Sequence, residues 1–193
     1  MKKIALADLK NLHEYELARP EFRRRLIEVK ARRRVSVGPL VTLVFENRDT
    51  VLCQIQEMLR AERIVEPAKV QQEIDVYNSL LPDSGEVAAT LFIEVTEEER
   101  VKPILDSFIG LDEGRSLWME IEDRKIFATF EAGHGREDKI SAVHYIRFLL
   151  GSEGQSSLDR TRRARLMLSH GEHRGEADLS PETVSELLRD LSG

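Results

Sequence analysis

The spacing of apolar residues changes at Pro82, and this change limits what the chain can fold into. Before Pro82, apolar side chains recur mostly every three to five residues, which is typical of helices with one apolar face. After it, short apolar and β-branched runs alternate with turn residues, which is typical of antiparallel strands. Near the end, Ser180-Pro181 and the apolar residues behind it predict a closing helix. We therefore predict a single α+β domain over residues 1–193, with a helical part at about 1–82, an antiparallel β-rich part at about 83–193 and a C-terminal helix.

Within the helical part, residues 6–30 have one apolar stripe, and Pro20 is expected to divide them into two helices because proline breaks a helix interior. The β-branched residues that follow predict two strand segments around a turn at Gly38-Pro39. The predicted elements are helices over about 6–19, 20–33 and 50–64, a further helix from Pro67, and strands over 35–37 and 40–45.

The β-rich part begins after the turn residues Pro82-Asp83-Ser84-Gly85. Thr96 and Glu99 have the spacing of a capping box, which predicts a short helix ending near Gly110. The Gly- and Ser-rich stretch Gly151–Asp159 predicts a mobile loop. Strands are predicted over 87–95, 116–121, 126–131, 140–150 and 162–169, with a hairpin around 122–125.

The composition excludes several classes of protein. The chain has 193 residues, of which 41% are hydrophobic, so it is long and apolar enough to bury a core. Its one cysteine, Cys53, cannot form an intrachain disulfide, which fits a reducing compartment. The apolar start is broken by Asp8 and Lys10, so we expect no signal peptide. No apolar run approaches the about 18 residues of a membrane-spanning helix. We therefore expect a cytoplasmic protein that does not enter membranes.

Motifs of common cofactor-dependent enzymes are missing from the sequence. It has no glycine-rich dinucleotide fingerprint and no phosphate-binding loop. It also lacks a nucleophile elbow and the set of cysteines that would hold an iron–sulfur cluster. We predict no cofactor and assign no catalytic residue, so a partner would have to carry any electrons.

A polar corner between a predicted strand and helix is our first candidate site. A helix N-terminus at this corner could receive an anion, with Arg48 as a bidentate donor. The alternative is structural, with Asn47 or Asp49 capping the helix and Arg48 pairing with a carboxylate. The candidate ligand- or partner-binding residues are Glu46, Asn47, Arg48, Gln54, Glu57 and Arg60.

Histidines of the β-rich part are a second candidate. His170 and His173 lie three residues apart with acidic residues nearby, and two histidines with a carboxylate can bind iron or zinc. The spacing alone is weak because no helix or hairpin is predicted there to make the rings converge. His134 belongs to a predicted loop, whereas His144 lies within a strand, where a histidine is more often a hydrogen-bonded core or interface residue.

Cys53 and an arginine cluster complete the candidates. Cys53 lies near a helix N-terminus, which can lower a thiol pKa, but its apolar neighbours predict a buried residue without a peroxidatic role. Between Arg19 and Arg34 the chain carries eight cationic residues and only two acidic ones. We favour a solvated helix face balanced by acidic neighbours, and the alternative is that the cluster binds an anionic protein or nucleic acid. Nucleic acid is the less favoured ligand because the chain has a net charge of −6 and Phe22 is the only aromatic residue within the cluster.

Several segments of the sequence match one known family: Phe45–Val51, Gln54–Ile64, Tyr15 with Arg19–Arg23, Tyr77–Pro82, Ser141–Phe148 and Leu179-Ser180. On these segments nearly the whole chain resembles a bacterial family defined only as a domain of unknown function. The resemblance implies no activity, but members of that family are often encoded beside rubrerythrin-like proteins and iron–sulfur oxidoreductases, which implies at most an accessory role in redox or peroxide metabolism. The chain departs from the family at Ser169–His173, where relatives are more acidic and contain proline, so the resemblance gives this loop no role.

These observations favour a non-enzymatic accessory or docking protein for a rubrerythrin-like or iron–sulfur oxidoreductase partner. The docking surface would be the predicted helix over 50–64 with its polar corner. Two alternatives stay open at this point. One is a metal-dependent enzyme that uses the histidines of the β-rich part, and the other is anion or nucleic-acid binding through Arg23–Arg34.

Overall fold

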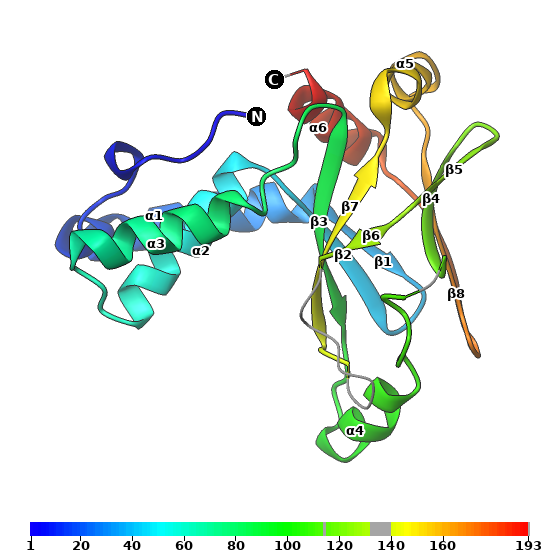
Figure 1. Cartoon of the computed structure of the whole chain (residues 1–193), viewed down its shortest axis with the longest axis horizontal. Helices are drawn as coiled ribbons and strands as arrows, with labels where there is room; N and C mark the ends of the chain where they lie inside the picture. Colours follow the sequence, from blue (N-terminus) through cyan, green and yellow to red (C-terminus); the bar gives the residue numbers. More distant parts are fainter. Residues whose placement is uncertain (114, 132–139, 193) are drawn as a thin grey trace.

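The computed structural model describes residues 1–113, 115–131 and 140–192. The chain forms helices and two antiparallel sheets, which confirms the predicted α+β class with N-terminal helices and a closing C-terminal helix. Figure 1 shows a helical arm on the left and a sheet body on the right. We call η1, α1, α2 and α3 the helical arm, and the two sheets with α4, α5 and α6 the sheet body.

The helical arm consists of η1 (Leu6–Asp8), α1 (Leu12–Ala31), α2 (Arg48–Ala61) and α3 (Pro67–Asn78). Asn11 caps α1, Asn47 caps α2, and α3 begins at Pro67, a residue suited to the first helical turn. The inner faces of α2 and α3 enclose a small apolar cluster together with residues from both ends of this region. Its buried members are Ile4, Val51, Ile55, Leu59, Val70, Ile74, Leu80 and Leu81.

Sheet A has the strand order β1-β2-β3-β7-β6, and neighbouring strands are antiparallel. Directly opposite residues on neighbouring strands point to the same face, so Phe45, Ala89 and Ile146 line the core side of the sheet. The strands are β1 (Arg34–Val37), β2 (Val41–Glu46), β3 (Glu86–Ile93), β6 (Thr129–Phe130) and β7 (Val143–Leu149).

Sheet B has the order β5-β4-β8-β9. It contains β4 (Leu117–Ile121), β5 (Arg124–Phe127), β8 (Arg165–His170) and β9 (His173–Asp178). The hairpin predicted around 122–125 is confirmed, because Ile121 pairs with Arg124 across a two-residue turn. The run predicted as one strand over 126–131 is divided, because the chain leaves sheet B at β5 and enters sheet A at β6.

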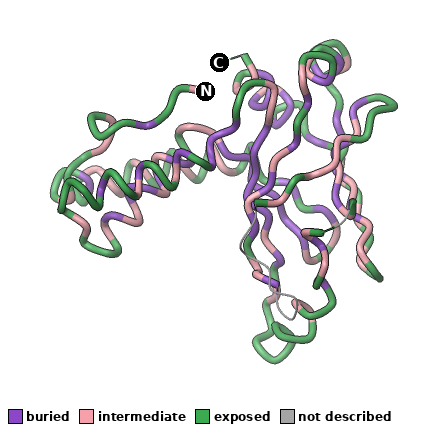
Figure 2. Tube along the Cα trace, in the orientation of Figure 1, coloured by how far each residue is buried: buried purple, intermediate pink, exposed green. Residues whose placement is uncertain are grey.

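The main core lies between the two sheets and under α6 (Pro181–Leu191), which contributes Val184, Leu187 and Leu188. Figure 2 shows this buried material running through the strands, whereas much of the helical arm is exposed. The sheet body also contains α4 (Glu98–Asp106) and α5 (Gly151–Thr161). Among the described residues, no helix is both long and apolar enough to cross a membrane.

The two sheets approach closely where β9 crosses the end of β1. A Cβ atom on Gly175 would lie 2.7 Å from the carbonyl carbon and oxygen of Val37. This distance is shorter than van der Waals contact, so only glycine allows the two backbones to meet at this point.

Pro20 does not divide the first helix, so that prediction was wrong. Helix α1 is continuous over 20 residues and contains Pro20 in its interior. The proline ring costs one backbone hydrogen bond, from residue 20 to the carbonyl of Glu16. Because Pro20 and Glu16 are both exposed, water can hydrogen-bond this carbonyl and the helix continues.

Three local predictions in the β-rich part were also wrong. Gly151–Asp159 is not a loop but lies within α5, where Gly154 packs closely against the side chains of Leu150 and Ile126. Thr96 does not cap α4, since the helix begins after Glu97 and has no side-chain cap. Strand β9 was not predicted, because its residues His173–Asp178 contain one apolar side chain, Ala177.

Candidate functional site

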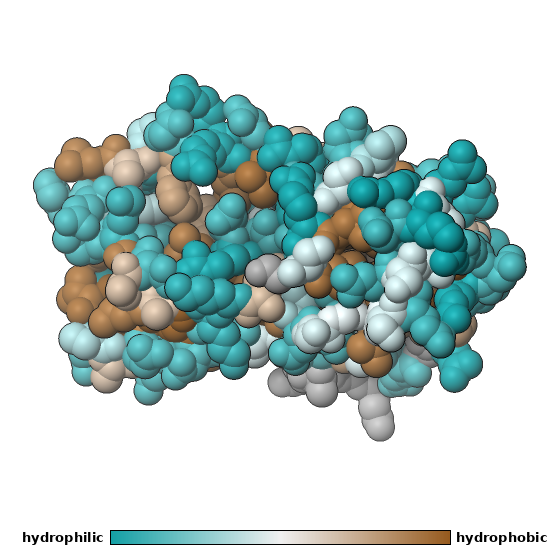
Figure 3. Space-filling view, turned by 90° about the horizontal axis from the view of Figure 1, so that it is seen from above, coloured by the Kyte–Doolittle hydropathy of each residue, from teal (hydrophilic) through white to brown (hydrophobic). Residues whose placement is uncertain are grey.

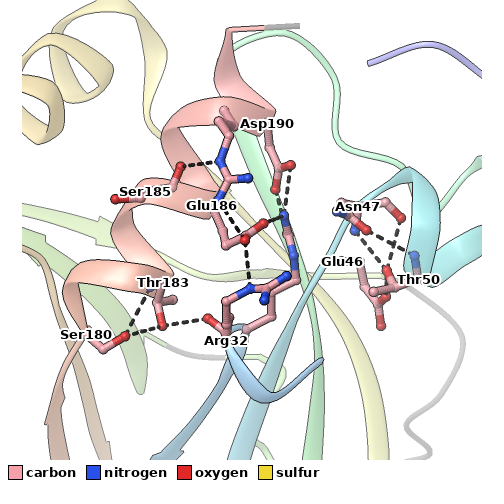
Figure 4. Close-up of polar contacts among 11 residues, drawn as sticks. Arg32, Glu46, Asn47, Thr50, Ser180, Thr183, Ser185, Glu186 and Asp190 are labelled. Carbon is pink, nitrogen blue, oxygen red and sulfur yellow. Dashed lines mark hydrogen bonds and ion pairs between the residues drawn. The ribbon is translucent and has the colours of Figure 1, made fainter. Parts of the chain in front are cut away.

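The polar corner begins with a buried carboxylate at the end of β2. Glu46 is buried, and its two oxygens accept hydrogen bonds from the hydroxyl groups of Thr50 and Thr90. Asn47 accepts the backbone N–H of Thr50 at 3.0 Å and donates its own N–H to the Thr50 hydroxyl oxygen at 2.9 Å (Figure 4). These contacts start α2 directly at the edge of sheet A, so Glu46 and Asn47 fix the direction in which the helical arm leaves the sheet body.

Arg48 points away from that group and forms an ion pair with Asp8 at 2.6 Å. A hydrogen bond from the backbone of Ala5, assisted by Arg48, lowers the pKa of Asp8 below its ordinary value. About two turns further along α2, Gln56 is buried and exchanges two hydrogen bonds with the backbone of Lys10, at 2.8 and 3.2 Å. These contacts fasten the N-terminal segment to α2.

Glu57 is the centre of the contact between α1 and α2. Its carboxylate accepts hydrogen bonds from Arg19 at 2.7 and 3.1 Å, from the Tyr15 hydroxyl at 2.9 Å and from Arg60 at 3.2 Å. The Arg19 hydrogen bonds lower the pKa of Glu57 to about 2. Burial, together with the bond to Glu57, raises the pKa of Tyr15, so the phenol stays protonated and donates. Arg60 also reaches Glu16 on α1 at 3.6 Å.

The six predicted site residues therefore lie along α2 rather than around one cavity. Glu46 and Asn47 contact sheet A, Arg48 contacts Asp8, and Glu57 with Arg60 contacts α1. Gln54 is half-buried between these groups. The charged members each form an ion pair or hydrogen bond with another part of the chain, as the structural alternative for this corner expects.

Cys53 is buried on α2, as its apolar neighbours predicted. Burial raises the pKa of its thiol, so the group remains protonated. A protonated, inaccessible thiol is a poor nucleophile.

His170 and His173 do come together, because the β8–β9 hairpin pairs them directly. Both imidazole rings stack on Phe108, with ring centroids 6.0 and 4.0 Å away. The nitrogens of His170 contact the Ser116 hydroxyl and the Ile109 carbonyl at 3.1 Å, and Nε2 of His173 lies 2.7 Å from the Ser107 hydroxyl. Burial lowers the pKa of His173, which favours the neutral ring. These contacts describe a hairpin held against the segment after α4.

Across residues 1–113, 115–131 and 140–192, no group of three or more His, Cys, Asp or Glu side chains is arranged to bind a metal. His144 is buried and contacts the Ser141 carbonyl through Nε2 at 2.7 Å. This placement agrees with the expectation of a hydrogen-bonded core residue. His134 lies outside the described residues.

The end of the arginine cluster forms internal ion pairs that hold the C-terminal helix. Arg33 is 1% exposed and bonds Glu186 at 2.8 Å and Asp190 at 2.6 Å. Arg32 bonds Glu186 at 3.0 Å, and its carbonyl accepts the Thr183 hydroxyl at 2.8 Å (Figure 4). Arg34 pairs with Glu94. These three cations are therefore directed at carboxylates of the sheet body rather than at a common ligand.

Apolar surface on the helical arm was not identified from the sequence. An open hollow of about 380 Å³ lies between the start of the chain and the turn after α2, and its apolar lining includes Leu9, Ile64 and Val70. A second hollow of about 350 Å³ adjoins it and shares Leu12 and Val65. Figure 3 shows brown, hydrophobic surface gathered over the arm, on the left of the view. The available signal was a set of apolar residues at the edges of the predicted helices.

Fold and site together define a class: an α+β protein whose two antiparallel sheets carry a projecting helical arm, with ion pairs rather than a catalytic constellation at the predicted corner. The chain belongs to the family described as "Protein of unknown function (DUF3501)", whose model matches residues 3–191. This match confirms the predicted membership of a domain-of-unknown-function family.

A crystal structure of a novel protein of unknown function from Burkholderia pseudomallei is similar to this chain along its whole length. The two sequences are 29% identical, the alignment covers 98% of this chain and 100% of the other, and the TM-score is 0.91. No curated protein matches the chain.

Proposed function

We propose that the protein is a non-enzymatic accessory protein that docks onto a partner protein through its helical arm. The observation that carries this proposal is the apolar surface of the arm. Leu6 and Val65 line the larger of the two hollows, and they are 52% and 72% exposed. Contiguous exposed apolar surface of this kind is typical of protein interfaces.

The polar corner supports docking indirectly. Glu57 and Arg60 lie at the contact between α1 and α2, whereas Glu46, Asn47 and Arg48 hold the start of α2 and the N-terminal segment. These residues therefore fix the relative positions of the helices that surround the hollows. A preformed surface binds with a smaller loss of conformational entropy than one that must become ordered.

For the partner we propose a rubrerythrin-like protein or an iron–sulfur oxidoreductase. The sequence contains one cysteine, which by itself cannot hold a cluster or form an intrachain disulfide. In this proposal the partner performs the redox chemistry, and the present chain contributes binding alone.

The test is calorimetric titration of the full chain with each purified candidate partner encoded in the same genome. We expect one of them to bind, and the double variant Leu6→Asp/Val65→Asp to weaken binding at least about tenfold, because it places charges in an apolar contact. The matched control is Leu149→Asp/Val143→Asp, which changes two exposed apolar residues of β7. Absence of binding by both candidates would refute the redox partnership, and equal affinity of the two double variants would refute docking at the arm.

A further inference from the structure

The outer face of α1, opposite its contact with α2, carries a second stripe of residues. Tyr15 is the one fully buried residue of this 20-residue helix, and it marks the inner face. On the opposite side Leu17 and Ile27 are 73% and 66% exposed. The outer residues follow one another at steps of four and three, which is the spacing of the a and d positions of a coiled coil. They are His13, Leu17, Pro20, Arg24, Ile27 and Ala31.

Charged residues flank this stripe at heptad spacing. Glu14, Glu21 and Glu28 are seven residues apart and form one row, in the e positions. Arg23 and Lys30 follow Glu16 at the same interval on the other side, in the g positions. In a coiled coil these flanking positions pair with charges on the second helix and determine which helix is bound.

Most of these flanking charges are available to a second helix. Among the described residues, Glu14, Glu28, Arg23 and Lys30 form no ion pair with another side chain, and the pair between Glu21 and Arg24 is fully on the surface. The stripe also begins where the smaller hollow ends, since His13 and Glu16 line that hollow. The outer face of α1 therefore adjoins the hollows of the arm.

We propose that the outer face of α1 binds a single amphipathic helix of a partner protein, as a short two-stranded coiled coil. The bound helix has apolar residues at heptad spacing, basic residues facing the Glu14–Glu21–Glu28 row and acidic residues facing Arg23 and Lys30. This inference rests on the docking role proposed above and names the chemistry of the partner. Leu17 and Ile27 are the two apolar anchors, and Arg24 between them is a polar core residue of the kind that fixes register.

A second copy of this chain would complement the flanking charges of α1 less well than a helix of a different protein. If two copies paired antiparallel about a two-fold axis, equivalent flanks would face each other, so the row of glutamates would meet the same row. If they paired in parallel, each g position would face the e position five residues further on. Arg23 would then face the partner's Glu28, but Glu16 would face the partner's Glu21, so one attraction would be offset by one repulsion.

The test uses three labelled helical peptides, each about three heptads long with leucine at both core positions. One has lysine on one flank and glutamate on the other, the second has lysine on both flanks, and the third has glutamate on both. Fluorescence anisotropy measures their binding to the full chain. We expect the mixed peptide to bind at least tenfold more tightly than either uniform peptide, because only the mixed peptide complements both rows of α1.

Two variants establish where the peptide binds. Leu17→Lys/Ile27→Lys should abolish binding of the mixed peptide, whereas the control Val76→Lys/Leu149→Lys, at equally exposed apolar positions, should leave it unchanged. Glu21→Lys/Glu28→Lys should transfer the preference to the peptide with glutamate on both flanks. Equal affinity for all three peptides, or an unchanged affinity in Leu17→Lys/Ile27→Lys, would overturn the inference.

Sedimentation of the free chain tests the alternative occupant. A dimer that Leu17→Lys/Ile27→Lys dissociates would replace the partner helix by a second copy and would also overturn the inference. Failure here is separate from failure of the proposed function. If a redox partner binds and its affinity is unaffected by Leu17→Lys/Ile27→Lys, only the coiled-coil inference fails. If the mixed peptide binds as expected and both redox partners do not, only the redox partnership fails.

Discussion

The helical arm and the sheet body use ionic contacts in different ways. In the sheet body, which has the large apolar core, Arg33 is buried together with its ion-pair partners Glu186 and Asp190. In the arm, which has a much smaller apolar cluster, Glu57 and Arg19 form a partly exposed ion pair. A buried ion pair makes each member dependent on the other, whereas an exposed pair contributes little and tolerates change. The comparison indicates that loss of one ionic side chain destabilises the sheet body strongly, whereas the surface of the arm can change without loss of the fold.

The largest effect is expected for Arg33→Met in the sheet body. The substitution leaves Glu186 and Asp190 without their buried cation, so the free energy of unfolding should fall by about 3–5 kcal/mol. Urea denaturation at pH 7 measures the change. Arg24→Met on the surface of α1 is the control, and it should cost under about 1 kcal/mol. A loss from Arg33→Met as small as that of the control would remove the contrast between the two regions.

Gly175→Ala tests how tightly the two sheets of the body are joined. The new Cβ would meet the backbone of Val37, so either β9 or β1 must move, at a cost of about 1–3 kcal/mol. Thermal denaturation of this variant is compared with that of Gly154→Ala in α5. There the Cβ meets the side chain of Leu150 at 3.2 Å, and the higher helix propensity of alanine offsets the crowding by about 1 kcal/mol. We expect Gly154→Ala to be the milder change, and the reverse order would show that β9 can separate from β1.

Glu57→Gln tests the ionic network of the arm and should cost about 1–2 kcal/mol at pH 7, because hydrogen bonds to a charged group are lost. The pKa of Glu57 falls from its ordinary 4.5 to about 2 on folding. A lowered pKa stabilises the fold fully above 4.5, and this contribution is lost as the pH falls towards 2. The difference in stability between the wild type and Glu57→Gln should therefore shrink over that range. A difference independent of pH would show that packing, not charge, joins α1 to α2.

Leu17→Lys/Ile27→Lys should have the smallest effect on stability, within about 0.5 kcal/mol, because both side chains are already largely in water. The same variant is expected to remove helix binding by α1. Urea denaturation of the free chain provides the stability measurement. A loss above about 2 kcal/mol would place these side chains in the folding core rather than on a docking face.

Periodic segments of the fold could be predicted from the sequence. Helix α6 follows Ser180-Pro181 as predicted, and β2 is a continuous apolar run between a turn and the cap Asn47. Segments shaped by tertiary packing could not be predicted. Helix α5 contains two glycines and three serines, and it is helical because Gly154 and Leu158 pack into the body. Strand β9 has little apolar pattern, since its pairing with β8 supplies the hydrogen bonds.

The sequence could predict which residues belong to the polar corner, but it could not predict which partners they contact. Sequence spacing places Asn47 before a helix, and it does cap α2. Arg60 bonds Glu57 from three residues away on the same helix, but Arg19 and Tyr15 come from α1, 38 and 42 positions away. Spacing within α2 contains no information about these two partners. The same limit applies to the arginine cluster, because the carboxylates that bind Arg33 belong to the last helix.

The bonds of Arg33 also affect how the protein is made. Its two carboxylate partners follow it by 153 and 157 positions, so they emerge from the ribosome long after Arg33 itself. Until then the first half of the chain contains a cation whose buried position has no counter-charge. A chain truncated before α6 lacks both of these carboxylates and cannot form the contact. Synthesis through Asp190 is thus a condition for the buried ion pairs of Arg33.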